Sequence, residues 1–82
     1  MPNLSKVLAE LEANVRNIRF ERLVTICTAF FGEPRVTGSH HIFKMPWAGD
    51  PRINIQRDRH SGKAKAEQVR AVIEALKKLD TD

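Results

Sequence analysis

The sequence contains only one cysteine, Cys27, and no long run of apolar residues. A single cysteine excludes an internal disulfide, and the apolar neighbours of Cys27 at helical spacing predict a buried structural thiol. The longest purely apolar runs have four residues or fewer, whereas a membrane-spanning helix needs about 20. The N-terminus also lacks the charged, apolar and small-residue order of a signal peptide. We therefore expect a cytoplasmic protein that does not enter a membrane.

Common catalytic and metal-binding signatures are missing as well. The sequence has no Walker-type glycine loop, no G-x-S-x-G nucleophile elbow and no Cys–His pair in a suitable arrangement. His40 and His41 are adjacent, so they point to opposite faces of any strand that contains them. The other ligand candidates have no recognised spacing: His60, Asp50 and Asp58. We predict neither a metal site nor a cofactor.

The size and composition of the chain are typical of one small globular domain over residues 1–82, with 41% hydrophobic and 29% charged residues. The net charge of +4 is unevenly distributed. Residues 34–70 carry eight basic and three acidic groups, whereas the charges before residue 34 cancel. Such a basic segment either attracts a polyanion such as RNA or forms a solvated charged face. Charge alone leaves both interpretations open.

Two helices are predicted in the first part of the chain. Apolar residues recur at three- and four-residue steps, with Asn3 available as the N-cap, which predicts an amphipathic helix over residues 1–18. A second pattern of this kind begins at Phe20 and stops before Gly32, which is soon followed by proline. Glycine and then proline form a stop signal for a helix.

Shorter, alternating patterns follow. The stretches 35–37 and 40–45 flank a Gly38-Ser39 turn and predict a β-hairpin. Residues 52–56 alternate cleanly and predict a third strand, and helical spacing resumes over residues 66–79. The order α-α-β-β-β-α predicts an α+β fold, in which helices cover one face of a three-stranded antiparallel sheet and the other face stays open.

His40 is the strongest candidate for a catalytic group. It follows the Gly38-Ser39 turn, where glycine lets a ligand backbone approach closely, and alternation places it on the outward face. Histidine exchanges protons near neutral pH, so His40 is suited to act as a general base on the 2′-hydroxyl of RNA. A surface histidine that only contacts RNA is the alternative. His41 shares a face with Phe43 and is predicted to be a partly buried structural residue.

Four cations are candidates for holding phosphate groups, together with the backbone of Gly38 and Ser39: Arg35, Lys44, Lys63 and Lys65. Arg35 and Lys44 accompany His40 on the outward face of the predicted hairpin. The two lysines stand at the start of the last helix, where unpaired N–H groups and the helix macrodipole already favour anions. The alternative is that these are solvated lysines with no ligand.

Three blocks of sequence together resemble the HicA family of bacterial toxins: G-S-H-H-I-F at 38–43, I-N-I-Q at 53–56 and G-K-A-K-A-E-Q-V-R at 62–70. They occur in the family's order and at similar spacing, and the resemblance covers roughly residues 20–79. It implies a fold like the double-stranded-RNA-binding domain, α-β-β-β-α. It also implies a ribosome-independent mRNA endoribonuclease of a type II toxin–antitoxin system, silenced by a HicB-type antitoxin, with His40 catalytic and Gly38 supporting its turn.

Three features depart from the family pattern. Ala66 stands where related sequences often have proline, the loop that carries Trp47 differs from that of compact members, and the shortest members lack the helix expected over 1–18. The chain thus resembles an extended variant. Trp47 is suited either to stack on a base or to pack over the core edge. Two other functions stay open: a non-catalytic module that binds double-stranded RNA, and a protein-interaction domain for an acidic partner.

Overall fold

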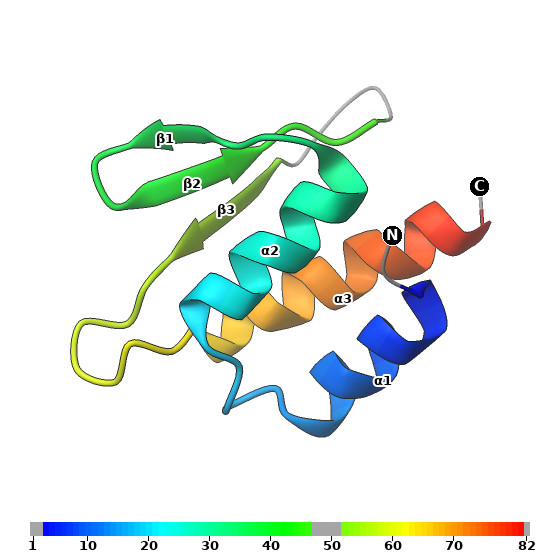
Figure 1. Cartoon of the computed structure of the whole chain (residues 1–82), viewed down its shortest axis with the longest axis horizontal. Coiled ribbons are helices and arrows are strands. Elements are labelled where there is room, and N and C mark those ends of the chain that lie inside the picture. Colours follow the sequence, from blue (N-terminus) through cyan, green and yellow to red (C-terminus); the bar gives the residue numbers. More distant parts are fainter. Residues whose placement is uncertain (1–2, 47–51, 82) are drawn as a thin grey trace.

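The computed structural model describes residues 3–46 and 52–81, so Trp47 lies outside the described residues. Within these ranges the chain forms three helices and three strands in the predicted order (Figure 1). The elements are α1 (Leu4–Ala13), α2 (Phe20–Phe31), β1 (Arg35–Thr37), β2 (His40–Phe43), β3 (Ile53–Gln56) and α3 (Ala66–Thr81).

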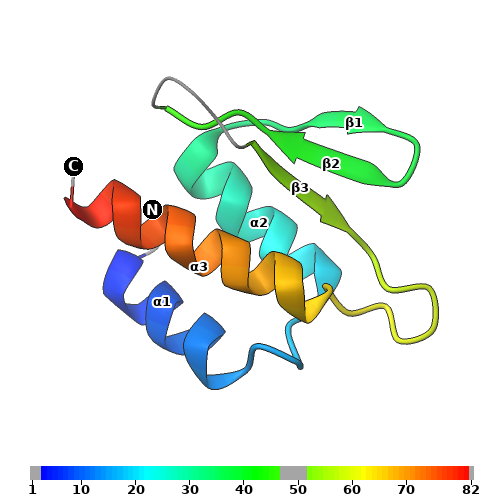
Figure 2. The ribbon, with the colours of Figure 1, turned by 180° about the vertical axis from the view of Figure 1, so that it is seen from behind.

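The strands form one antiparallel sheet in the order β1-β2-β3, and helices cover one of its faces. α2 packs against β2 and β3, and α3 packs against β3. α1 packs against α3 on the side away from the sheet, as two opposite views show (Figures 1 and 2). The predicted α+β class is therefore confirmed, including the additional N-terminal helix.

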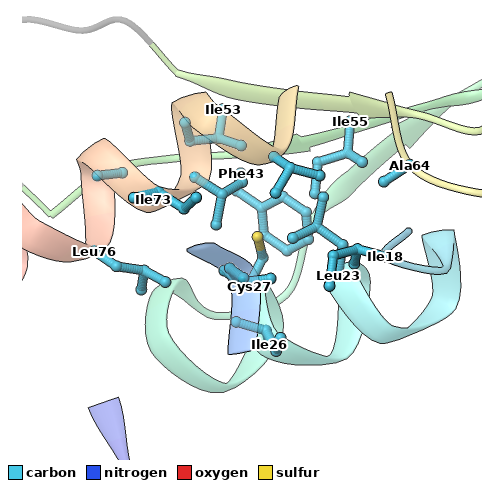
Figure 3. Packing of buried hydrophobic residues seen from close by; sticks show 14 of the residues in the cluster. Ile18, Leu23, Ile26, Cys27, Phe43, Ile53, Ile55, Ala64, Ile73 and Leu76 are labelled. Carbon is cyan, nitrogen blue, oxygen red and sulfur yellow. The ribbon is translucent and has the colours of Figure 1, made fainter. Parts of the chain in front are cut away.

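The hydrophobic core lies between the sheet and the helices (Figure 3). Its largest fully buried side chains include Phe43, Leu11, Leu23, Ile26, Ile55 and Leu76. Cys27 on α2 is fully buried among them, and this burial raises the pKa of its thiol to about 12. A thiol with such a pKa stays protonated at neutral pH and is a poor nucleophile. The prediction of a buried structural cysteine is confirmed.

Alternation in the strands separates the buried face of the sheet from its outer face. Ile55 is completely buried and Ile53 is 6% exposed, whereas Asn54 between them is exposed. The β2–β3 register pairs His40 with Gln56 and Ile42 with Asn54. Because paired residues point to the same face, His40, Asn54 and Gln56 all belong to the outer face, as the alternation predicts.

The predicted ends of two strands are wrong by a short distance. β2 ends at Phe43, although Met45 is still buried, and proline at position 46 cannot donate a hydrogen bond that would continue the ladder. β3 begins at Ile53 rather than Arg52, because Ile53 is the partner of Phe43, the last residue of β2.

The first helix is shorter than the predicted 1–18, because it ends at Ala13. Asn14 closes it in two ways: its backbone N–H donates to the carbonyl of Leu11 at 3.2 Å, and its side-chain amide donates to the carbonyl of Glu10 at 2.9 Å. Asparagine side chains compete for backbone groups in this way and favour helix ends. Ile18 keeps the apolar spacing and is buried, but it lies in the connection to α2.

A surface ion pair joins the additional helix to α2. The guanidinium of Arg22 donates two hydrogen bonds to the carboxylate of Glu10, at 2.8 and 2.9 Å. These hydrogen bonds lower the pKa of Glu10 below its ordinary value of 4.5. A second pair, Lys77 with Glu12 at 3.3 Å, joins α1 to α3. Charge therefore supplements the apolar contacts that hold α1.

Replacing Glu10 by glutamine is expected to remove a small, pH-dependent contribution to stability. The lowered pKa means that the pair stabilises the fold above the ordinary carboxyl pKa, and that this contribution is lost as the pH falls through the folded-state value. Exposed pairs contribute about 0–1 kcal/mol. In urea unfolding, the free energy of unfolding of wild type is expected to exceed that of Glu10→Gln by no more than this amount at neutral pH, and to equal it in strong acid. The same difference at neutral and acidic pH would contradict a stabilising role for the Glu10–Arg22 pair.

Candidate functional site

The β1–β2 turn places His40 at one end of the sheet. Gly38 has a φ of +59°, in the left-handed region that favours glycine, and an added Cβ would find no atom within 4 Å. The turn is therefore tight, with open space beside it. His40 is half-buried and pairs with Thr37 on one side and with Gln56 on the other. His40 is thus the first residue of the central strand, and its imidazole lies on the outer face of the sheet.

The imidazole of His40 contacts an amide from the neighbouring strand. Its Nδ1 lies 3.1 Å from Oδ1 of Asn54, within hydrogen-bonding distance. Asn54 is not directly opposite His40 but one position further along the same face of β3, since its own partner is Ile42. Diagonal neighbours of this kind are within reach of long side chains. The contact holds the ring on the surface of the sheet.

Gln56 connects three separate segments at the same end of the sheet. Its side-chain amide donates to Oγ of Ser39 in the β1–β2 turn at 3.2 Å, and its Oε1 accepts from Nζ of Lys65 at 3.4 Å. Its backbone N–H donates to Oε1 of Gln68 on α3 at 2.7 Å. Through these contacts the ammonium of Lys65 is tied to the strand position that pairs with His40.

Lys63 points elsewhere. Its Nζ donates to Oδ1 of Asn17 at 2.9 Å, and its backbone forms a β-bridge with Arg19 at the start of α2. The two lysines, predicted together as a phosphate seat, therefore have different neighbours: Lys65 lies toward the sheet and Lys63 toward the α1–α2 connection.

Both lysines nevertheless line one shallow pocket of about 420 Å³ at the N-terminal end of α3. Arg16 and Arg70 also line it, so four cations surround the depression, against the two carboxylates of Asp58 and Glu67. The carboxylate of Asp58 accepts hydrogen bonds from the backbone N–H groups of the next residues in its own loop, which lower its pKa. The pocket carries an excess of positive charge suited to an anion.

Arg35 and Lys44 are exposed and lie along the sheet from His40 rather than directly opposite it. Arg35 pairs with Ile42, so it shares the outer face with His40 but lies two residues along β1 from Thr37, the direct partner of His40. Lys44 follows the end of β2, at a separation from His40 of about 13 Å in an extended chain. These cations extend the basic surface along the sheet, whereas the hydrogen bond of the His40 imidazole goes to Asn54.

His41 faces the other side of the sheet, as predicted. Its ring meets the ring of Phe20 edge-on, with centroids 5.0 Å apart, and the guanidinium of Arg57 lies 5.3 Å from the same phenyl ring. Nδ1 of His41 is buried without a hydrogen-bond partner. This half-buried, apolar setting is that of a packing residue, and it separates the roles of the two adjacent histidines.

The sequence predicts Asn54 and Gln56 only as outward-facing residues of the strand over 52–56. Alternation between Ile53 and Ile55 is enough to expose both amides. What the local pattern lacks is the register of β3 against β2, because that register pairs residues 10 to 16 positions apart in the sequence. The pairing of His40 with Gln56 is therefore not visible in the local sequence. The contact of Asn54 with His40 and that of Gln56 with Ser39 both depend on it.

Other features and comparisons add no ligand to this site. Among residues 3–46 and 52–81, no three His, Cys, Asp or Glu side chains gather closely enough to hold a metal ion. In the same ranges, every helix is too short or too polar to cross a bilayer. No family model, no curated protein and no solved structure matches the chain.

Proposed function

We propose that this protein is a cytoplasmic endoribonuclease that cleaves mRNA without a metal ion, the toxin of a type II toxin–antitoxin pair of the HicA kind. The observation that carries the proposal is the position of His40 on the outer face of the sheet. There it lies beside the Gly38-Ser39 turn and is linked through Gln56 to the ammonium of Lys65. A proton acceptor and a phosphate-binding cation thus occupy one end of the sheet.

Cleavage of RNA by such a site needs no external nucleophile. The imidazole of His40 takes the proton of the 2′-hydroxyl, and the 2′-oxygen attacks the adjacent phosphorus. The bond from phosphorus to the 5′-oxygen breaks, and that oxygen takes up a proton from water. The products are a 2′,3′-cyclic phosphate and a 5′-hydroxyl. Lys65 is placed to neutralise the negative charge that grows on the phosphoryl oxygens.

The remaining cations bind the RNA chain away from the scissile bond. Arg35 and Lys44 extend along the outer face, and Lys63 belongs to the pocket at the start of α3. Contacts of this kind hold phosphates irrespective of base sequence. The backbone of the Gly38-Ser39 turn is exposed and gives RNA close access to His40.

The fold and the sequence resemblance are a second line of support for the proposal. The order α2-β1-β2-β3-α3 is the α-β-β-β-α order of the double-stranded-RNA-binding domain, which the resemblance to HicA toxins implies. The resemblance also implies a HicB-type antitoxin as a partner. An acidic surface on that partner would complement the basic segment and would block RNA by covering His40 and Lys65.

Cleavage in the presence of EDTA is the experiment that tests the proposed function. Purified protein is expected to cut a labelled RNA at the same rate with and without the chelator, and the 5′ fragments are expected to end in a cyclic phosphate. The matched control is the same RNA with one 2′-deoxy nucleotide at the cleavage position, which should stay intact there because it lacks the nucleophile.

Two results would contradict the proposal in different ways. Loss of cleavage in EDTA that a divalent ion restores would mean that the mechanism requires a metal. Salt-dependent binding of RNA with no cleavage under any condition would favour the alternative, a non-catalytic module for double-stranded RNA.

A further inference from the structure

The contact between His40 and Asn54 determines which ring nitrogen of His40 is free to accept a proton. An amide oxygen is only a hydrogen-bond acceptor. Oδ1 of Asn54 lies 3.1 Å from Nδ1 of His40, so Nδ1 carries the hydrogen when the ring is neutral. Neutral imidazole has one N–H, and the partner of one nitrogen sets the state of the other. Nε2 is then left with the free electron pair.

We propose that Asn54 is a positioning residue that holds His40 in the Nδ1-protonated form, so that Nε2 is the atom that accepts the 2′-hydroxyl proton. This inference rests on the proposed ribonuclease function. When the proton has been transferred, Nδ1–H still donates to the amide oxygen, and the dipole of the amide stabilises the imidazolium. Asn54 thus acts through His40 and needs no contact with RNA.

The position of Asn54 in β3 indicates that it has a role besides forming the strand. Asparagine is depleted in strands, yet this one stands in the middle of β3. The flanking residues Ile53 and Ile55 are buried, which forces its side chain to the outer face. The register of β3 then puts it two residues from Gln56, the partner of His40, on the same face of the sheet. A β-branched residue would suit the strand better and would lose the contact.

The charged groups around this contact explain why an amide suits the position. One cation, Lys65, is linked through Gln56 to the strand position that pairs with His40. Other cations lie in β1 or flank β2 and β3: Arg35, Lys44 and Arg52. A carboxylate in place of Asn54 would add a negative charge beside His40, which would compete with RNA phosphates for these cations and would stabilise the imidazolium. An amide orients the ring without adding a charge.

Nitrogen NMR of the labelled protein, recorded where the histidines are neutral, tests the proposal without RNA. In wild type, the ring spectrum of His40 is expected to show a protonated Nδ1 and an unprotonated Nε2. In Asn54→Ala the ring is expected to shift toward the Nε2-protonated form that free imidazole favours, while Asn54→Asp should keep the wild-type form. A wild-type spectrum with the hydrogen on Nε2 would overturn the proposal.

Cleavage measurements complete the test. Asn54→Ala is expected to lose roughly 10- to 100-fold in kcat/KM, by analogy with the loss of a partner that orients a metal-bound histidine, with an unchanged melting temperature. Asn54→Asp should recover most of the rate, but with its acid limb moved to higher pH, because the carboxylate stabilises the imidazolium. Thr37→Ala is the matched control, since Thr37 pairs with His40 from the other strand, and full activity is expected.

The outcomes distinguish this inference from the proposed function. If wild type cleaves no RNA, the ribonuclease proposal fails, yet the spectra still decide whether Asn54 sets the form of the ring. If wild type cleaves RNA and Asn54→Ala cleaves it equally fast, or if Asn54→Ala keeps the wild-type ring spectrum, Asn54 has no positioning role.

Discussion

Replacing His40 by alanine is expected to abolish RNA cleavage and growth arrest while the fold stays intact. A positioned general base contributes about 10²- to 10⁴-fold to a rate, and in this protein no second histidine lies on the outer face among the described strand residues. The side chain is half-buried and forms a hydrogen bond with Asn54, which is itself exposed. Its removal therefore costs the core little. Cleavage kinetics and growth after induction measure the loss.

His41→Ala is the matched control, because it changes the same residue type at the next position. The ring of His41 packs edge-on against Phe20, and such aromatic contacts are worth about 0.5–1.5 kcal/mol. The control is expected to melt several degrees lower, since about 1 kcal/mol shifts the melting temperature of a domain of this size by roughly 4–8 °C. It should still cleave RNA below that temperature. Equal toxicity of wild type and His40→Ala at matched expression would reject the catalytic assignment.

The arrangement of the layers could be predicted from the sequence because it follows from short-range patterns. Alternation at Ile53 and Ile55 assigns the two faces of β3 without any knowledge of its neighbours. Gly32, with a φ of +89°, ends α2 where glycine followed by proline predicts a stop. Each signal acts within a few residues, so the order of elements is predictable even when the distances between them are not.

The error at the end of the first helix arose because polar groups override the apolar spacing there. The pattern between Leu4 and Ile18 continues past the end of α1, because a residue can be buried at helical spacing without being in a helix. Asn14 decides the matter by bonding to the backbone of Glu10 and Leu11. An asparagine that can end a helix is visible in the sequence, but whether the helix ends there depends on how the next segment packs.

The candidate site could be predicted only in part. His40, Ser39 and Lys65 were chosen from residue type and local setting, and the fold brings them to one end of the sheet. Their connection through Gln56 depends on strand register and on the path of the 57–65 loop, which no local pattern specifies. The same loop turns Lys63 toward Asn17, so two lysines that are only two residues apart receive different surroundings.

This difference leads to the second large effect, expected from reversing the charge of Lys65. Lys65→Glu should weaken RNA binding for all sequences and lower the slope of its salt dependence by about 1, as the loss of one phosphate contact requires. It should also slow the cleavage of bound RNA, because Lys65 is tied to the position that pairs with His40. Binding titrations at several salt concentrations and single-turnover cleavage at saturating protein measure the two effects separately.

Lys63→Glu is the control for Lys65→Glu, because it makes the same charge change in the same pocket. It should weaken binding in a similar way, yet leave the single-turnover rate near that of wild type, since the Nζ of Lys63 contacts Asn17 in the α1–α2 connection and not the sheet. Both variants should fold, as acidic residues suit the N-terminus of a helix. Equal losses of the single-turnover rate in the two variants would mean that the lysines act only as general attraction for RNA. In that case the link through Gln56 would carry no catalytic role, and phosphate stabilisation would have to come from another cation of the outer face.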